Sequence, residues 1–300
     1  MKISQPLNHL QVIGVPYRNA DFAEPIVTVL KAFESSQAYT KAGVLFDYAE
    51  PDLSENERTA VETDNIGRLN GSIADHVANA RRENRAILMT GGNCCHITGV
   101  VGGLQDVHGP DVKVGLVWFD AHGDYNTPQT TLSGMLGGMP VAVCAGLAFP
   151  NWRELSHIKS PIPTDRIVMV DVRNLDEAEE QLVRATGVKT CQPAPGFPGE
   201  PLEPAIQELA DNCDIIYLHI DSDILDERYV PNHGTVEPNG PSMDEVMAAL
   251  DVVMNTGKVA VLALVSIYGE GEGADISIAS GIEVLERGLA SWQKAGMVQS

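Results

Sequence analysis

The sequence contains no uninterrupted apolar run close to the ~18 residues that a membrane-spanning helix needs. Its opening segment, MKISQPLNHLQVIGVPY, also lacks a basic stretch followed by a long apolar run and a small-residue cleavage site. Neither a transmembrane segment nor a secretion signal is therefore expected.

Basic residues are scarce, since 20 Lys and Arg stand against 41 Asp and Glu, which gives a formal net charge of −21. Such a chain repels phosphate backbones and anionic lipids, so neither nucleic acid nor a membrane is an expected partner. Cysteine is also scarce. The five cysteines are an odd number, and Cys94 and Cys95 are adjacent, which is an awkward basis for a disulfide framework. A reducing, cytoplasmic location is expected.

Short apolar runs alternate with amphipathic stretches along the whole chain. Runs rich in Val, Ile and Leu predict strands buried on both faces, as in a parallel sheet. They are Leu10–Val15, Val44–Phe46, Ala86–Met89, Val114–Phe119, Ile167–Val172, Ile215–Ile220 and Val259–Ile267.

Between these runs, apolar residues recur at helical spacing. One helical face holds Ile66, Leu69, Ile73, Val77 and Ala80, and another holds Met243, Val246, Leu250 and Val253. The alternation predicts βαβ units with right-handed crossovers and helices on both faces of the sheet. The proline-rich segment Gln192–Pro204 is expected to be a surface loop, so residues 1–300 are expected to form a single domain.

Polar residues gather where three of the expected strands end. VGLVWF leads into Asp120-Ala121-His122-Gly123-Asp124, IIYLHI leads into Asp221-Ser222-Asp223, and AILM leads into TGGNCCH. The carboxyl ends of parallel strands form the ligand site of such sheets, and alternate residues point the same way. Asp120, His122 and Asp124 are thus expected to converge, and so are Asp221 and Asp223.

Four carboxylates held together would repel one another, and divalent cations remove that repulsion. Carboxylate and imidazole ligands suit Mn²⁺ and its neighbours. Two such ions generate hydroxide from bound water near neutral pH and polarise the atom under attack. A single DxD is more often a turn or a helix cap, but two such motifs, each behind an apolar strand, favour a metal centre.

These motifs, in this order, resemble those of arginases and agmatinases. DAHGD resembles the DAHxD signature, HIDSDILD resembles SxDxDxxDP, and GGNCCH lies where the family has GGDHS, as in an atypical subgroup with GNC in place of GDH. The resemblance implies a three-layer α/β/α fold with a mostly parallel sheet, a homo-oligomer (trimer or hexamer) and hydrolysis at a guanidinium or amidinium carbon. It also implies a binuclear manganese centre held by Asp120, His122, Asp124, Asp221 and Asp223.

Two further segments resemble arginase loops that bind an amino acid. Residues 126–134, NTPQTTLSG, resemble NTPxTTxSG, which implies that Asn126 and Ser133 bind a substrate carboxylate. Residues 173–179, RNLDEAE, resemble RxxDxxE, which implies that Asp176 and Glu179 face an α-ammonium group. Both segments also have an ordinary structural interpretation, the first as turn chemistry and the second as an acidic helix start.

Three positions depart from the family's pattern. Cys94 replaces a metal-binding histidine; its thiolate would favour Zn²⁺ or Fe²⁺ over Mn²⁺, and an inert buried thiol is the alternative. Gly137 replaces a proton-transferring histidine, and Ser266 replaces a glutamate that pairs with the guanidinium. The replacements considered are His96 for the metal ligand, His219 and His233 for the proton carrier, and Glu270 and Glu272 for the carboxylate.

The leading hypothesis is a hydrolase that uses two divalent ions to cleave a linear C–N bond in a guanidino, amidino or formimino amino acid. His122 and Asp124 are the predicted catalytic residues, and Cys94 is considered as a sixth metal ligand. The alternative is a catalytically impaired relative that binds an amino acid or serves as an oligomer subunit. Cys94, Gly137 and Ser266 favour that alternative.

Overall fold

The computed structural model describes residues 7–41 and 43–298. Its centre is a sheet of eight strands in the order β4-β1-β5-β10-β9-β6-β7-β8, and all its pairings within the described residues are parallel. The strands are β1 (His9–Val15), β4 (Leu45–Ala49), β5 (Ala86–Gly91), β6 (Val114–Phe119), β7 (Ile167–Val170), β8 (Lys189–Cys191), β9 (Ile215–Asp221) and β10 (Val259–Val265). A separate antiparallel hairpin joins β2 (Tyr17–Arg18) to β3 (Asp21–Phe22).

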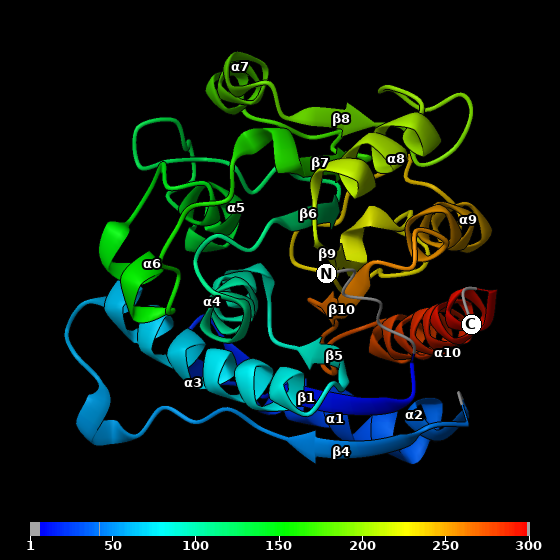
Figure 1. Ribbon diagram of the computed structural model, residues 1–300, viewed down its shortest axis with the longest axis horizontal. Helices are drawn as coiled ribbons and strands as arrows, with labels where there is room; N and C mark the ends of the chain where they lie inside the picture. The colour runs from blue at the N-terminus through cyan, green and yellow to red at the C-terminus, as the bar shows by residue number, and fades with distance from the viewer. Residues whose placement is uncertain (1–6, 42, 299–300) are drawn as a thin grey trace.

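Helices cover both faces of the sheet, which makes three layers (Figure 1). Strand residues alternate between two apolar cores: Leu116 and Trp118 of β6 lie in one, and Val117 and Phe119 lie in the other. The first core is covered by α3 (Glu62–Arg82), α4 (Ile97–His108), α5 (Pro140–Cys144), α6 (Pro150–Leu155) and α7 (Glu177–Thr186). The second is covered by α1 (Glu24–Ser35), α2 (Ala38–Lys41), α8 (Leu202–Asn212), α9 (Met243–Met254) and α10 (Ala274–Val298). The predicted α/β architecture is confirmed.

Several strand boundaries differ from the prediction for local reasons. Asp171 and Ser266 adopt φ values of 68° and 63°, and β7 and β10 each end two residues before the predicted end. The strand predicted at Val44–Phe46 lies at the sheet edge, where Leu45 is 75% exposed, so its predicted burial on both faces is wrong. The three-residue β8 and the β2–β3 hairpin were not predicted, because they are too short to carry a period.

The two helical faces read from the sequence both lie against the sheet, in α3 and α9. Helix α9 begins with a capping box, in which the Ser242 hydroxyl accepts the Glu245 N–H and the Glu245 carboxylate accepts the Ser242 N–H. Segment 192–204 is irregular up to Pro201, except that Cys191 pairs with Glu200, and α8 begins at Leu202.

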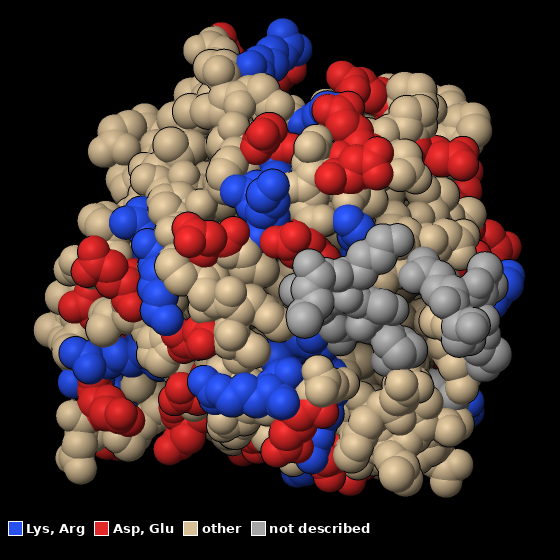
Figure 2. Space-filling model, in the orientation of Figure 1, with Lys and Arg blue, Asp and Glu red and all other residues tan. Residues whose placement is uncertain are grey.

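Across the described ranges 7–41 and 43–298, even the longest helix lacks the apolar length that a bilayer crossing requires. On the face shown in Figure 2, Lys and Arg side chains are interspersed with Asp and Glu.

Candidate metal centre

The strands β5, β10, β9 and β6 are consecutive in the sheet, so their carboxyl ends share one edge. The residues that follow them line a cavity of about 450 Å³, a size typical of small-ligand sites. All the residues predicted as metal ligands or substrate contacts line it: Cys94, Asp120, His122, Asp124, Asn126, Ser133, Asp176, Glu179, Asp221 and Asp223.

Asp221, at the end of β9, receives several donors. Its Oδ2 accepts hydrogen bonds from the Ser266 hydroxyl at 2.7 Å and from the Cys94 thiol at 2.9 Å. Its Oδ1 accepts the Asp223 N–H at 3.1 Å and lies 3.3 Å from His233 Nε2. Burial opposes ionisation of Asp221, but His233, Cys94 and Ser266 outweigh it and lower its pKa below the usual range.

His122 lies between the carboxylates that follow β6 and β9. Its Nδ1 is 3.4 Å from Asp120 Oδ1 and 3.1 Å from Asp223 Oδ2, and its Nε2 is 3.3 Å from Glu237 Oε1. Asp120 is fixed by the His122 N–H at 2.6 Å, and Asp223 by the Ala121 N–H at 3.3 Å. The imidazole is thus held on both sides by carboxylates.

The charges of this cluster are unevenly compensated. Burial, and then the carboxylates of Asp223, Asp124 and Asp221, raise the pKa of Asp120 well above its usual value. Burial opposes protonation of His122, but Asp120 and Asp223 outweigh it and raise the His122 pKa to about 12. Without a cation, a retained proton and the His122 imidazolium balance the negative charge of the carboxylates. Divalent cations are therefore the natural partners of the cluster.

Asp124 leaves the strand geometry that Asp120 and His122 follow. Its φ of 46° lies in the left-handed region, which Asp and Asn tolerate better than most residues. Its carboxyl lines the same cavity and is buried, and burial, Asp221 and Glu179 raise its pKa although His122 opposes the shift. Its carboxyl is not part of the converging ligand sets found within the described residues.

Those ligand sets test whether the cluster suits a metal. In each set, three ligand atoms lie within 4.8 Å of one another: Cys94, Asp120 and Asp221; Asp120, His122 and Asp223; and Asp221, Asp223 and His233. Each of the three aspartates belongs to two sets, so the sets share their carboxylates. His233 Nε2 is buried, and its 3.3 Å ion-pair contact with Asp221 Oδ1 lacks hydrogen-bond geometry among the residues that the structure describes. The donors therefore fit one or two divalent cations.

Two of the histidines considered as replacements serve the packing instead. His96 accepts the Asn93 N–H at Nδ1 (3.1 Å), and its Nε2 lies 2.8 Å from the Asn19 carbonyl, outside the cavity lining. His219 stacks on Trp118 with 4.0 Å between ring centroids, and burial lowers its pKa to about 3. His219 Nε2 is 3.6 Å from the Cys94 sulfur, so the imidazole packs on the cluster from behind.

The other two departures from the family pattern are Gly137 and Ser266. A Cβ added to Gly137 would meet only the Asn93 side chain, at 3.9 Å, so its side of the cavity is open space. Ser266 uses its hydroxyl to hold Asp221. Glu270 and Glu272 are exposed and lie outside the cavity lining, so neither supplies the missing carboxylate.

The predicted substrate contacts lie together but are partly engaged with one another. The Asn126 amide donates to Asp176 at 3.2 Å and accepts from the Thr130 hydroxyl at 2.8 Å. Glu179 accepts the Tyr125 N–H at 2.8 Å, and Ser133 is exposed at the cavity rim. The ordinary interpretations hold as well, because Thr130 closes a turn and α7 begins with acidic residues just after Asp176.

Sequence reasoning missed Arg18, Glu237 and Tyr268, which also line the cavity. All three lie in irregular segments or in the two-residue strand β2, where no periodicity marks them. Closeness in sequence to a strand end was the available signal, since Tyr268 follows β10 by three residues and Arg18 follows β1 by three.

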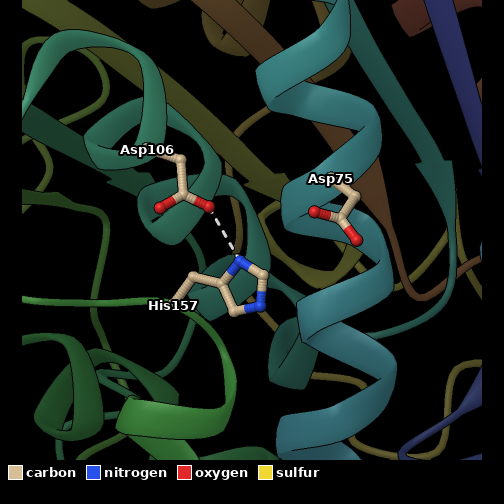
Figure 3. Close-up of side chains that lie close together, drawn as sticks. All are labelled: Asp75, Asp106 and His157. Atoms are coloured by element: carbon tan, nitrogen blue, oxygen red, sulfur yellow. Dashed lines mark hydrogen bonds and ion pairs between the residues drawn. The ribbon is translucent and has the colours of Figure 1, made fainter.

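A second acidic group lies away from this cavity, between α3, α4 and the segment after α6 (Figure 3). Asp106 Oδ2 lies 2.7 Å from His157 Nδ1, and Lys159 Nζ lies 2.7 Å from Asp106 Oδ1. Asp75, across from His157, is exposed. Because both Asp106 oxygens have partners and Lys159 supplies a positive charge, this group is an ion-pair network between elements.

Comparisons with known proteins agree with the fold. A family model described as the arginase family matches residues 25–287. An arginase of Bacillus subtilis is 27% identical over 225 residues, which are 72% of this chain and 75% of that protein. An arginase of Neurospora crassa is 28% identical over 216 residues, 67% of this chain, and the match spans 58% of that protein's length.

Solved structures show the same fold. The arginase of Entamoeba histolytica in complex with L-ornithine superposes with a TM-score of 0.79 and 21% identity, covering 95% of this chain and 99% of that one. The formimidoylglutamase of Bacillus subtilis superposes with a TM-score of 0.71 and 17% identity, covering 96% and 88%.

Proposed function

Because the chain belongs to the arginase family, we propose that it hydrolyses a linear C–N bond in a small guanidino, amidino or formimino compound of amino-acid type. One observation carries the proposal: carboxylates, an imidazole and a thiol from neighbouring strand ends converge in a single cavity. In this proposal the ligands of two divalent cations, Mn²⁺ or else Zn²⁺ or Fe²⁺, are Asp120, His122, Asp124, Asp221, Asp223 and Cys94.

The cations, when bound, would supply a nucleophile from water near neutral pH and polarise the carbon under attack. Asp124 would orient the attacking water by accepting a hydrogen bond, while His122 would hold a cation through Nδ1 and its backbone N–H fixes Asp120. Asn126 and Ser133 would donate to the substrate carboxylate, and Asp176 and Glu179 would accept from its ammonium group. In this step the oxygen of water would bond to the carbon, the C–N bond would break, and a proton from that water would pass to the departing nitrogen, which leaves as an amine.

Metal content and product release test this function together. The purified chain is incubated with Mn²⁺, desalted under reducing conditions and analysed for metal per chain. Release of urea from guanidino amino acids, and of the corresponding amide from amidino and formimino amino acids, is then screened. We expect about two ions per chain and release of one product class. About one ion would indicate a mononuclear or mixed site, to be repeated with Zn²⁺ and Fe²⁺. If the chain binds none of these metals, the proposal is overturned.

A second candidate function is binding of an amino acid without turnover. One observation favours it: the Cys94 thiol and the Ser266 hydroxyl both donate to Asp221, which satisfies that carboxylate without a cation. Burial, then Asp221, Asp124 and Asp120, raise the pKa of Cys94 well above its usual value, so the thiol keeps its proton there. Amino-acid binding that is indifferent to added metal, with no product release, would support this candidate.

Glu237 is predicted to tune metal affinity through His122. Its Oε1 faces His122 Nε2 at 3.3 Å, and the Asn174 amide also donates to this carboxylate. A carboxylate on one imidazole nitrogen leaves the other nitrogen free to bind a cation. We expect Glu237→Gln to weaken Mn²⁺ binding about 10–100-fold in calorimetric titration. Glu227→Gln, an exposed site in the same segment, is the control; equal affinity in the two variants would contradict the role.

The homo-oligomer is implied by the family resemblance, whereas the cytoplasmic location and the single domain were inferred from the sequence itself. A single domain over residues 1–300, a homo-oligomer and a cytoplasmic location therefore stay predictions.

A further inference from the structure

Arg18 is the only lysine or arginine among the described residues that line the cavity, whereas seven carboxyl groups line it. The guanidinium lies over the Tyr268 ring, 5.4 Å from its centroid. Across the described part of the chain, no carboxylate lies within ion-pair distance of Arg18, so its contact with Tyr268 leaves its N–H donors available. An Arg held by an aromatic face, with its donors unpaired, is prepared to bind an anion in a bidentate manner.

The turn that carries Arg18 is tied to the strand-end segment of β5. Asn93 accepts the Asn19 N–H at 3.3 Å and donates to the Asn19 side-chain oxygen at 2.9 Å. His96 adds its contact with the Asn19 carbonyl. Asn93 stands where the family has an aspartate, and an aspartate there could not donate to Asn19. Asn93 and His96 therefore fix the turn next to Arg18 at the cavity.

The position of Arg18 also fits a small substrate. The Tyr268 ring contacts Arg18 at 5.4 Å and the His233 ring at 5.8 Å, and His233 adjoins Asp221. Arg18 and the carboxylate cluster line the same cavity and are linked through Tyr268 and His233, so one ligand with a head group and a carboxylate can contact both.

We propose that Arg18 binds the carboxylate of the substrate, so that the site selects ω-guanidino, amidino or formimino acids over alkyl analogues that keep the head group but lack the carboxylate. This inference rests on the proposed function, which supplies the head group at the metal cluster. Arg18 provides the charged partner of the carboxylate, and the neutral donors Asn126 and Ser133 are auxiliary. The Asn126 amide is already engaged with Asp176, which leaves less of it for the ligand.

The test compares matched ligands on the full chain loaded with Mn²⁺. ω-Guanidino acids of three to six carbons, and the alkylguanidines that lack their carboxylate, are titrated by calorimetry, and their hydrolysis is followed by urea release. We expect Arg18→Ala to weaken binding of the best acid, and to raise its KM, about 10–100-fold with kcat little changed. Alkylguanidine binding should stay the same, and Arg18→Lys should recover part of the loss.

Two further variants test whether the effect on acid binding is specific to Arg18 and the turn that carries it. Arg228 stacks on Tyr229 at 5.1 Å outside the cavity, so Arg228→Ala should change neither ligand class. Asn93→Asp should weaken acid binding in the same direction as Arg18→Ala, because the turn loses its tie to Asn19.

The outcomes distinguish this inference from the function. If acids bind in an Arg18-dependent way but no C–N bond is cleaved, the hydrolase proposal fails and the inference survives. If acids are hydrolysed equally well by wild type and Arg18→Ala, the inference is overturned and the function stands. Preference of the wild type for alkylguanidines, or binding of neither class, also overturns the inference.

Discussion

Replacing Asp124 by asparagine is expected to lower kcat on the order of 10³-fold or more, with the fold retained. The variant keeps the size of the side chain, and Asn tolerates the φ of 46° that Asp124 adopts. The structural cost is therefore small. The lost negative charge would remove both a metal ligand and the group proposed to orient the attacking water.

The measurement is the rate of urea or amide release at saturating substrate, together with Mn²⁺ affinity and the midpoint of thermal unfolding. Asp211→Asn removes one charge at an exposed site of α8 and serves as the matched control. Near-normal kcat in Asp124→Asn would remove Asp124 from the catalytic assignment. A collapse of the unfolding midpoint would show instead that the residue acts on the fold.

Replacing Glu179 by glutamine is expected to stabilise the metal-free protein above pH 7 by roughly 3 kcal/mol relative to wild type. Burial raises the pKa of Glu179 to about 7 from 4.5, although the Tyr125 N–H opposes the shift. Between pH 4.5 and about 7, the folded state therefore keeps a proton on Glu179 that the unfolded state has released. The resulting stabilisation is present below pH 4.5 and is lost as the pH rises through about 7. Glutamine stays neutral throughout and can still accept the Tyr125 N–H.

The test is urea unfolding of chelator-treated protein from pH 5 to pH 8. Wild type should lose stability across this window, and Glu179→Gln should lose roughly 3 kcal/mol less. Glu177→Gln, exposed on the same first turn of α7, should follow wild type. Parallel curves for wild type and Glu179→Gln would contradict the assigned burial effect. The same variant should bind an α-ammonium ligand more weakly, since the proposed carboxylate partner is gone.

The parallel sheet was predictable because its signal is local and repeated. Runs such as VGLVWF and IIYLHI are apolar at successive positions, and only a strand covered on both faces uses such a run. The residues that follow these strands were likewise predictable as a cluster, since parallel strands bring their carboxyl ends to one edge. What this reasoning could not supply was the order of the strands. The central position of β9 and β10, between β5 and β6, depends on packing between distant segments.

The geometry inside the cluster was less predictable. Alternation along a strand placed Asp120 and His122 on one side, but it did not predict the left-handed φ of 46° at Asp124. The preceding Gly123 lies so close to Glu179 and Leu175 that a Cβ there would meet both at 2.8 Å. His96 was considered as a metal ligand from its distance in sequence. The backbone instead turns it toward Asn19, a residue 77 positions away.

The sequence by itself determined the class of fold, the strand ends that carry the polar residues, and the chemical type of the site, because each depends on residues close together in the chain. Only the tertiary structure decided which groups surround the cluster. His233 and Glu237 reach it from an irregular segment, Tyr268 reaches it from the end of β10, and Arg18 reaches it from a two-residue strand. Their positions follow from long-range hydrogen bonds and ring contacts, which no periodicity along the chain records.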